Sequence, residues 1–154
     1  MINLFSYYVG ELKDFIDKAL TTKDYLIKII ISDTSESLIH DLGNIGIDID
    51  ATFRHTLDNN AVRHVIKRHG NINEEFRGQT PITEADLLLI PEIVSSYESI
   101  STKKNHRGQD VIVYTKTFSD GISYYVEEIR IGRHELAAIN IYKRKKDSSP
   151  TLID

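Results

Sequence analysis

Residues 110–143 read DVIVYTKTFSDGISYYVEEIRIGRHELAAINIYK, and this stretch decides the fold class. It contains three runs of strand length that are rich in β-branched and aromatic residues: Asp110–Phe118, Ser123–Ile131 and Glu135–Lys143. Asp120-Gly121 is a strong hairpin signal between the first two runs, and Gly132 marks the turn between the second and the third. The pattern therefore predicts an antiparallel β-meander.

The segment Leu57–Gly70 (LDNNAVRHVIKRHG), upstream of the meander, has the features of a helix. Asp58 or Asn59 caps its start, and Gly70 is expected to end it in the left-handed conformation. The side chains expected to form its buried stripe are Ala61, Val65 and Ile66.

A second helix is predicted over Thr83–Tyr97 (TEADLLLIPEIVSSY), after a loop at Gln79-Thr80-Pro81. Thr83 and Asp86 have the spacing of a capping box, which is typical of a helix start. Pro91 ends or kinks this helix, or begins a new turn.

The first third of the chain is predicted to hold a helix followed by β structure. Leu12, Phe15, Ile16 and Ala19 share one helical face of Glu11–Leu20. Asp24–Ser32 is rich in β-branched residues and predicts a strand, and the short run Gly46–Asp50 alternates between apolar and polar residues. Helices first and a meander last imply an α+β fold, with helices on one face of an antiparallel sheet.

The composition limits the classes of protein that remain. At 154 residues we expect a single domain over residues 1–154, with the tail Asp147–Asp154 frayed. The absence of cysteine excludes disulfides, thiolate nucleophiles and cysteine-ligated metals. No signal peptide or membrane span is apparent, so no membrane partner is expected. The net charge is −4, yet residues 60–146 hold 14 basic and 11 acidic side chains, so the positive charge lies in one segment.

The helix ending at His69 holds the candidate catalytic residues. His64, Lys67 and Arg68 share one face, and His69 lies in the last turn. Two imidazoles beside cations suit acid–base cleavage of a phosphodiester, with Lys67 and Arg68 holding phosphate. The alternative is that Lys67, Arg68 and His69 only complement the helix dipole. Zinc helices place histidines at i and i+4 with a glutamate between them, so we expect no metal and no other cofactor here.

A second polar set lies on the meander. If both hairpins have three-residue turns, Lys116 lies opposite Tyr124, and Tyr124 lies opposite Asn140. In that register Lys116, Tyr124, Asn140 and Tyr142 share one face, which suits a phosphate and a ribose. A slip of one residue removes the arrangement, and a solvated polar face is the alternative.

These segments together resemble the phage-type barnase–EndoU–colicin–RelE nucleases. The resemblance covers residues 57–146. The segments that carry it are the two-histidine helix Arg63–Gly70, the following Gly78–Thr83 with Asp86 and Ile90-Pro91, and the strand residues Tyr114–Lys116 and Tyr142-Lys143.

The resemblance implies N-terminal helices packed on a small antiparallel sheet, and it implies roles for particular residues. His64 and His69 would be the acid–base pair, Lys116 the cation that stabilises the transition state, and Tyr142 the strand residue that faces the scissile phosphate. Members of the family often have a hydroxyl residue two positions before this tyrosine, where this chain has Asn140. Asparagine donates hydrogen bonds to phosphate but relays no proton.

The resulting hypothesis is a metal-independent endoribonuclease in which the ribose 2′-hydroxyl attacks, leaving a 2′,3′-cyclic phosphate. The resemblance implies a toxin domain that acts on RNA, with tRNA favoured, in the cytoplasm of its own or a target cell. It also implies delivery within a larger secreted or phage-borne protein, and a neutralising immunity protein as partner. Two other hypotheses stay open: a non-catalytic nucleic-acid-binding module, and a degenerate toxin or phage protein-interaction domain.

Overall fold

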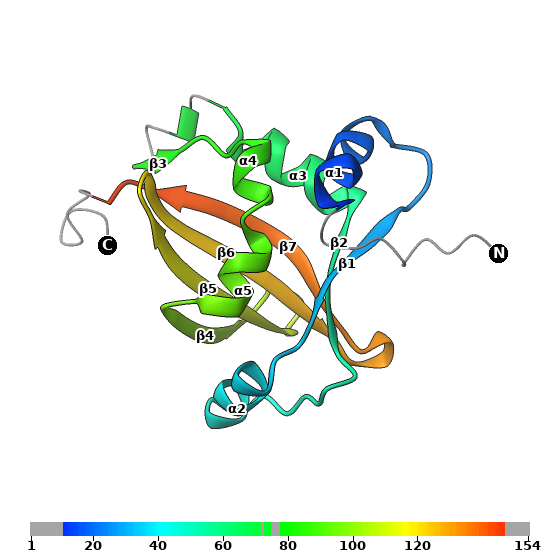
Figure 1. Ribbon diagram of the computed structural model, residues 1–154, viewed down its shortest axis with the longest axis vertical. Coiled ribbons are helices and arrows are strands. Elements are labelled where there is room, and N and C mark those ends of the chain that lie inside the picture. The colour runs from blue at the N-terminus through cyan, green and yellow to red at the C-terminus, as the bar shows by residue number, and fades with distance from the viewer. Residues whose placement is uncertain (1–10, 72, 75–77, 147–154) are drawn as a thin grey trace.

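The computed structural model describes residues 11–71, 73–74 and 78–146, and within them the fold is α+β (Figure 1). The predicted tail Asp147–Asp154 lies outside the described residues. In chain order the elements are α1 (Leu12–Thr21), β1 (Lys28–Asp33), α2 (Glu36–Asn44), β2 (Arg54–Asp58), α3 (Asn59–His69), β3 (Gln79–Thr80), α4 (Glu84–Leu87), α5 (Ile90–Ser96), β4 (Ser99–Lys104), β5 (Asp110–Phe118), β6 (Gly121–Arg130) and β7 (Glu135–Arg144).

The described strands form one sheet in the order β1-β2-β7-β6-β5-β4, with β3 paired to the end of β7. β2 and β7 run parallel, and the other neighbouring pairs are antiparallel. The predicted meander is confirmed as β5-β6-β7. Strand β4 extends it by a hairpin that the sequence analysis did not predict, because its sequence SISTKK is polar and lies at the exposed sheet edge.

Helices cover one face of this sheet. Figure 1 shows α4 and α5 lying across the meander, while α1 and α3 group beside β7. The side chains of the meander that point into this core are Ile112, Tyr114, Tyr125, Leu136 and Ile141. No helix in the described ranges is long and apolar enough to cross a membrane.

Helix α3 is anchored at both ends. Asp58 is its N-cap, and its carboxylate accepts a hydrogen bond from the backbone of Ala61 at 2.8 Å. Asn59 is fully buried, and its side chain bonds the backbone of the segment that leads into β1. Gly70 has φ −97°, so the predicted left-handed stop is wrong. A glycine suits this position because a Cβ would lie 2.4 Å from the carbonyl oxygen of Ile66.

The second predicted helix forms as two short helices. The capping box of Thr83 and Asp86 is present at the start of α4. Pro91 lies in the first turn of α5, so it begins a new helix. Gln79-Thr80, expected as loop, adds β3 to the edge of β7.

Two β predictions for the first third need correction. The strand expected over Asp24–Ser32 begins only at Lys28, and Gly46–Asp50 forms no strand. Ile47 and Ile49 are buried against the core from an irregular segment. The alternation of apolar and polar residues in Gly46–Asp50 therefore reflects alternating burial, but the segment has no partner strand to pair with.

Both predicted hairpin registers are wrong: the register between β5 and β6 is off by one residue, and the register between β6 and β7 is off by two. Phe118 pairs with Gly121, so the β5–β6 turn has two residues, and Lys116 pairs with Ser123 instead of Tyr124. Tyr124 pairs with Thr115 on one side and with Tyr142 on the other. Because successive residues of a strand face opposite sides, this slip places Lys116 on the face opposite Tyr124.

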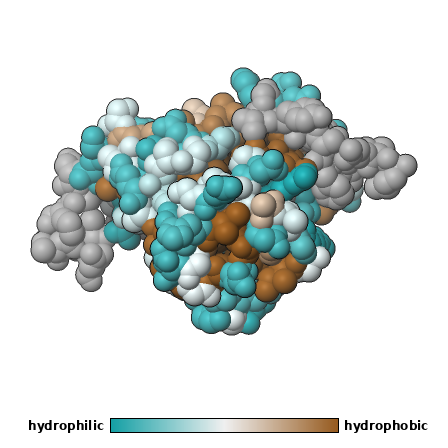
Figure 2. Space-filling view, turned by 60° about the horizontal axis from the view of Figure 1, so that its bottom comes forward, coloured by the Kyte–Doolittle hydropathy of each residue, from teal (hydrophilic) through white to brown (hydrophobic). Residues whose placement is uncertain are grey.

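Apolar side chains also reach the surface. Figure 2 views the end of the molecule that carries α2, and shows apolar residues between polar ones. The exposed large apolar side chains of the described residues include Ile45, which follows α2, and Ile131 in the β6–β7 turn. Ile131 lines a cavity that also includes Asp58 and Asn60 at the start of α3.

Candidate functional site

The candidate site lies where the C-terminal half of α3 meets the end of β7. Alternation along β7 puts Asn140, Tyr142 and Arg144 on the face of the sheet opposite α5, and the cross-strand pair puts Tyr124 beside Tyr142. We call this the outer face. The structure thus brings together three of the predicted site residues, Tyr124, Asn140 and Tyr142, on one surface.

Planar side chains form a stack on the outer face. The rings of Tyr124 and Tyr142 are parallel to within 3°, with centroids 4.9 Å apart. The ring of His69 lies 5.8 Å from that of Tyr142, and the Arg144 guanidinium carbon lies 5.8 Å from the Tyr124 centroid. The histidine at the end of α3 and the closing strand therefore belong to one cluster, although about seventy residues separate them in the sequence.

His69 is held in a defined orientation. Its ring is buried, and Nδ1 donates to Oε2 of Glu74 at 2.8 Å. Because the carboxylate occupies Nδ1, the other ring nitrogen, Nε2, is the one that can bond a ligand or transfer a proton. Nε2 is buried and has no hydrogen-bond partner among the described residues.

Other buried polar atoms near the end of α3 and the end of β7 also lack a hydrogen-bond partner. Within the described ranges, five buried side-chain atoms lack a partner, and the four at this corner are Nε2 of His69, Oε1 of Gln79, Oδ1 of Asn140 and Nε of Arg144. Gln79 pairs with Arg144 across β3 and β7. Buried polar groups without partners are rare, and a ligand that offers both acceptors and donors would satisfy this set.

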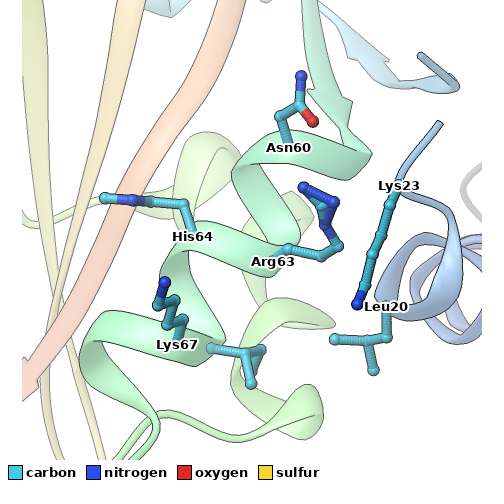
Figure 3. A pocket seen from close by; sticks show the side chains of 7 residues that line it. Leu20, Lys23, Asn60, Arg63, His64 and Lys67 are labelled. Carbon is cyan, nitrogen blue, oxygen red and sulfur yellow. The ribbon is translucent and has the colours of Figure 1, made fainter. Parts of the chain in front are cut away.

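His64 lies on the exposed side of the same helix. Figure 3 shows its side chain directed toward β7, while Arg63 turns toward Lys23 and Leu20. His64 lines a cavity of about 510 Å³ together with Lys23, Arg63 and Lys67. Partial burial lowers the pKa of His64, and the nearby charges of Arg68 and His69 lower it further. A lowered pKa favours the neutral imidazole, which is the form that accepts a proton.

Lys67 and Arg68 are exposed at the end of α3, and neither forms an ion pair with a described residue. They remain available to a polyanion. Tyr142 is half-buried, and burial raises the pKa of its hydroxyl, so it stays a hydrogen-bond donor at neutral pH.

Lys116 does not join the other predicted residues. Its ammonium group donates to the carbonyl of Ser96 at 3.1 Å and lies 6.0 Å from the ring centroid of Phe118. The two-residue turn that shifts the register is the reason. The shared face predicted for Lys116 and Tyr124 is therefore wrong.

Three residues of the cluster were missed by the sequence analysis. Arg144 belongs to the basic run 143–146, and its position two residues after Tyr142 was the available signal, because alternate residues share a face. Its neighbour Lys143 points the other way and is buried against Asp86 and Asp120. Glu74 and Gln79 lie in stretches whose sequence has no periodicity, so their spacing did not predict a place in this cluster.

No group of three or more histidine, aspartate or glutamate side chains suited to a metal ion occurs within the described parts of the chain. The arrangement that does occur is an acid–base one: His69, which has a carboxylate partner, lies beside Tyr142 on a face that also carries Asn140 and Arg144, and His64 lies earlier on the same helix. These are the groups that transfer protons and hold a phosphate.

A comparison with protein families identifies the family of the chain. A family model described as phage-Barnase-EndoU-ColicinE5/D-RelE like nuclease3 matches residues 26–149. The match includes all of the elements from β1 to β7, and therefore extends the resemblance of residues 57–146 toward the N-terminus. No curated protein and no solved structure matches the chain.

Proposed function

This chain belongs to the phage-Barnase-EndoU-ColicinE5/D-RelE like nuclease family, and from that premise we propose that it is an endoribonuclease that works by histidine acid–base catalysis. The observation that carries the proposal is the buried, unpartnered Nε2 of His69, oriented by Glu74 and set beside Tyr142. A histidine fixed in this way, within a nuclease fold, is suited to proton transfer at a phosphodiester.

The proposed reaction is a transphosphorylation. The 2′-oxygen forms a bond to phosphorus while the bond from phosphorus to the 5′-oxygen breaks, which gives a 2′,3′-cyclic phosphate and a free 5′-hydroxyl. His64 takes the 2′-hydroxyl proton, because its lowered pKa keeps it neutral. His69 donates a proton to the leaving 5′-oxygen through Nε2, because the carboxylate of Glu74 holds Nδ1 and leaves Nε2 without a partner among the described residues.

The remaining groups bind the phosphate. Arg144 takes the role of the transition-state cation that the family resemblance assigned to Lys116, because Arg144 is the cation on the outer face beside Tyr124. Tyr142 and the amide of Asn140 donate to phosphate oxygens. Lys67 and Arg68, which are adjacent in the last turn of α3, bind the RNA backbone beside the site.

RNA is the substrate because its own 2′-hydroxyl supplies the nucleophile. We further propose that tRNA is the target, that the chain acts as a toxin in the cytoplasm of its own or a target cell, and that it is delivered within a larger secreted or phage-borne protein. An immunity protein would neutralise it. These statements rest on family membership and on the resemblance of the histidine helix.

The test is cleavage of bulk tRNA by His64→Ala and His69→Ala variants in the presence of a chelator. Each substitution is expected to lower kcat by about 100-fold or more, since general acid–base groups contribute on that scale. His40→Ala is the matched control, because His40 is exposed on α2 at the far end of the molecule. The wild-type product should carry a 2′,3′-cyclic phosphate.

Two results would contradict this mechanism. One is unchanged cleavage by both histidine variants, and the other is loss of wild-type cleavage when the chelator is added. Binding of RNA without any product, at all pH values, would point to a non-catalytic nucleic-acid-binding module.

A further inference from the structure

The cavity that His64 lines continues past this histidine to the end of α1 (Figure 3). The other residues that line it come from the end of α1 and from α3: Leu20, Lys23, Asn60, Arg63, Ile66 and Lys67. We call this cavity the α1–α3 groove. At about 510 Å³ it is as large as many ligand sites. The proposed reaction uses only two of its residues, His64 and Lys67, so most of the groove is left without a role.

The charge of the α1–α3 groove has one sign. Lys23, Arg63 and Lys67 are cations, and no aspartate or glutamate of the described residues lines it. None of the three cations forms an ion pair within the described parts of the chain. Nη1 of Arg63 donates to the carbonyl of Thr22 at 3.5 Å, and this long contact accompanies the turn of its guanidinium toward Lys23 (Figure 3). Cations without carboxylate partners attract an anionic ligand.

The floor of the groove is aliphatic. Leu20 and Ile66 are partly buried there, and no phenylalanine or tyrosine of the described residues lines the groove. Nucleobases stack on aromatic side chains, whereas a phosphate needs only cations and N–H donors. The aliphatic stems of lysine and arginine pack on such a floor while their charged ends stay in water. The groove is therefore suited to the backbone of a nucleic acid rather than to its bases.

The order of residues along α3 indicates which part of an RNA lies in the groove. In the proposed reaction His64 takes the proton of the attacking 2′-hydroxyl, and His69 gives a proton to the leaving 5′-oxygen. The nucleotide that carries the attacking hydroxyl is on the 5′ side of the scissile phosphate. From the last turn of α3 toward its start, His69 comes first, His64 second and Arg63 next. An RNA strand that passes His64 on its 5′ side therefore enters the α1–α3 groove.

We propose that the α1–α3 groove binds the next phosphate on the 5′ side of the scissile one, through Lys23 and Arg63. The proposal rests on the proposed ribonuclease function and adds a substrate requirement: the attacking nucleotide must carry a 5′ phosphodiester. Recognition through the backbone is independent of the base sequence, because phosphate contacts position a nucleic acid without reading it.

The first test measures binding, independently of cleavage. The probe is a fluorescein-labelled 2′-O-methyl oligouridylate of about ten nucleotides, which has no 2′-hydroxyl to react. Its affinity is measured at several salt concentrations, because the slope of log affinity against log salt counts phosphate contacts, at about 0.7 per contact for a single strand. Lys23→Gln and Arg63→Gln should each lower the magnitude of this slope by about 0.7, and the double variant by about 1.4.

Lys103→Gln is the matched control for this measurement. It removes an exposed cation of β4 that does not line the groove, so the salt slope should stay at its wild-type value. Circular dichroism and Tm establish that each variant is folded.

The second test establishes the direction of the strand. A methylphosphonate is uncharged, and in place of the phosphate next to the cleaved bond on its 5′ side it should lower the kcat/KM of the wild type by about two- to fivefold. The Lys23→Gln/Arg63→Gln double variant should show no further loss, because it already lacks this contact. A methylphosphonate next to the cleaved bond on its 3′ side should cost both proteins the same.

The outcomes distinguish the two proposals. An unchanged salt slope in the folded double variant overturns the phosphate site, even if cleavage depends on His64 and His69, and would point to an acidic protein as the occupant of the groove. A lowered slope in a protein whose cleavage is unaffected by both histidine variants supports the phosphate site and refutes the proposed catalytic function. A methylphosphonate effect that the double variant abolishes on the 3′ side overturns the proposed direction.

Discussion

At the residue scale, His64 and His69 differ in their surroundings although they share one helix. His64 is exposed beside Arg68, and its pKa is lowered by burial and by the neighbouring positive charges. His69 is buried with a carboxylate on Nδ1. The lowered pKa of His64 is the basis for naming it the base, and the Nε2 of His69, which Glu74 leaves without a partner among the described residues by holding Nδ1, is the basis for naming it the acid.

The assignment of His64 predicts a pH dependence. With His64 as base, kcat/KM should rise with pH through a midpoint below the ordinary imidazole value, because the neutral form already dominates at lower pH. Arg68→Gln removes a nearby positive charge, so the pKa of His64 should increase and this midpoint should move to higher pH. Rates measured between about pH 4 and 8 at constant ionic strength check the direction.

Lys103→Gln serves as the control for charge removal, because Lys103 is exposed on β4, away from α3. A midpoint that stays in place in Arg68→Gln, or moves to lower pH, would remove His64 from the role of base.

At the element scale, α3 joins the two halves of the site. Its first turn is fixed by the Asp58 cap and by Asn59, and its last turn places His69 against β7. Helix α3 is short, with 11 residues, so most of its stability must come from caps and packing. The position of the histidines therefore depends on contacts at both ends of the helix.

Asp58→Ala is expected to lower the free energy of unfolding by about 1 kcal/mol, because one backbone N–H of the first turn loses its acceptor. Asp48→Ala is the control, since Asp48 is an exposed aspartate in the irregular segment before β2. Urea unfolding measured at pH 7 gives the comparison. Equal midpoints for the two variants would show that the cap contributes nothing.

At the scale of the whole molecule, the two faces of one sheet are used differently. The inner face holds the core and the buried ammonium of Lys143, which bonds Asp86 in the α4 capping box and Asp120 in the β5–β6 turn, both at 2.7 Å. The outer face holds the candidate site. Lys143 therefore ties β7, which carries Tyr142 and Arg144, to two other parts of the fold.

Lys143→Met is expected to lower the free energy of unfolding by about 3 kcal/mol, because it leaves the buried carboxylate of Asp86 without its cation. The double variant with Asp86→Asn should recover part of that loss. Thermal and urea unfolding of the single and double variants check both statements. A single variant as stable as wild type would show that this ion pair is not a structural tie.

The sequence by itself determined the α+β class, the meander, the histidine helix and the capping box, because each depends on local signals: alternation, helical spacing, caps and turns. It also singled out His69 and Tyr142, whose rings lie 5.8 Å apart in the folded chain, and His64 on the same helix. The sequence did not predict strands β2 and β4, because they are short or polar and are stabilised by the strands beside them.

Only the tertiary structure decided the rest. The length of one turn set the register, and with it sent Lys116 to the inner face and Tyr124 to the outer. The pairing of Glu74 with His69, and the meeting of His69 with Tyr142, bring together residues whose contact leaves no period in the sequence. Local patterns fix what each element is, while the faces that meet depend on long-range packing, which is why the cluster became visible only in the folded chain.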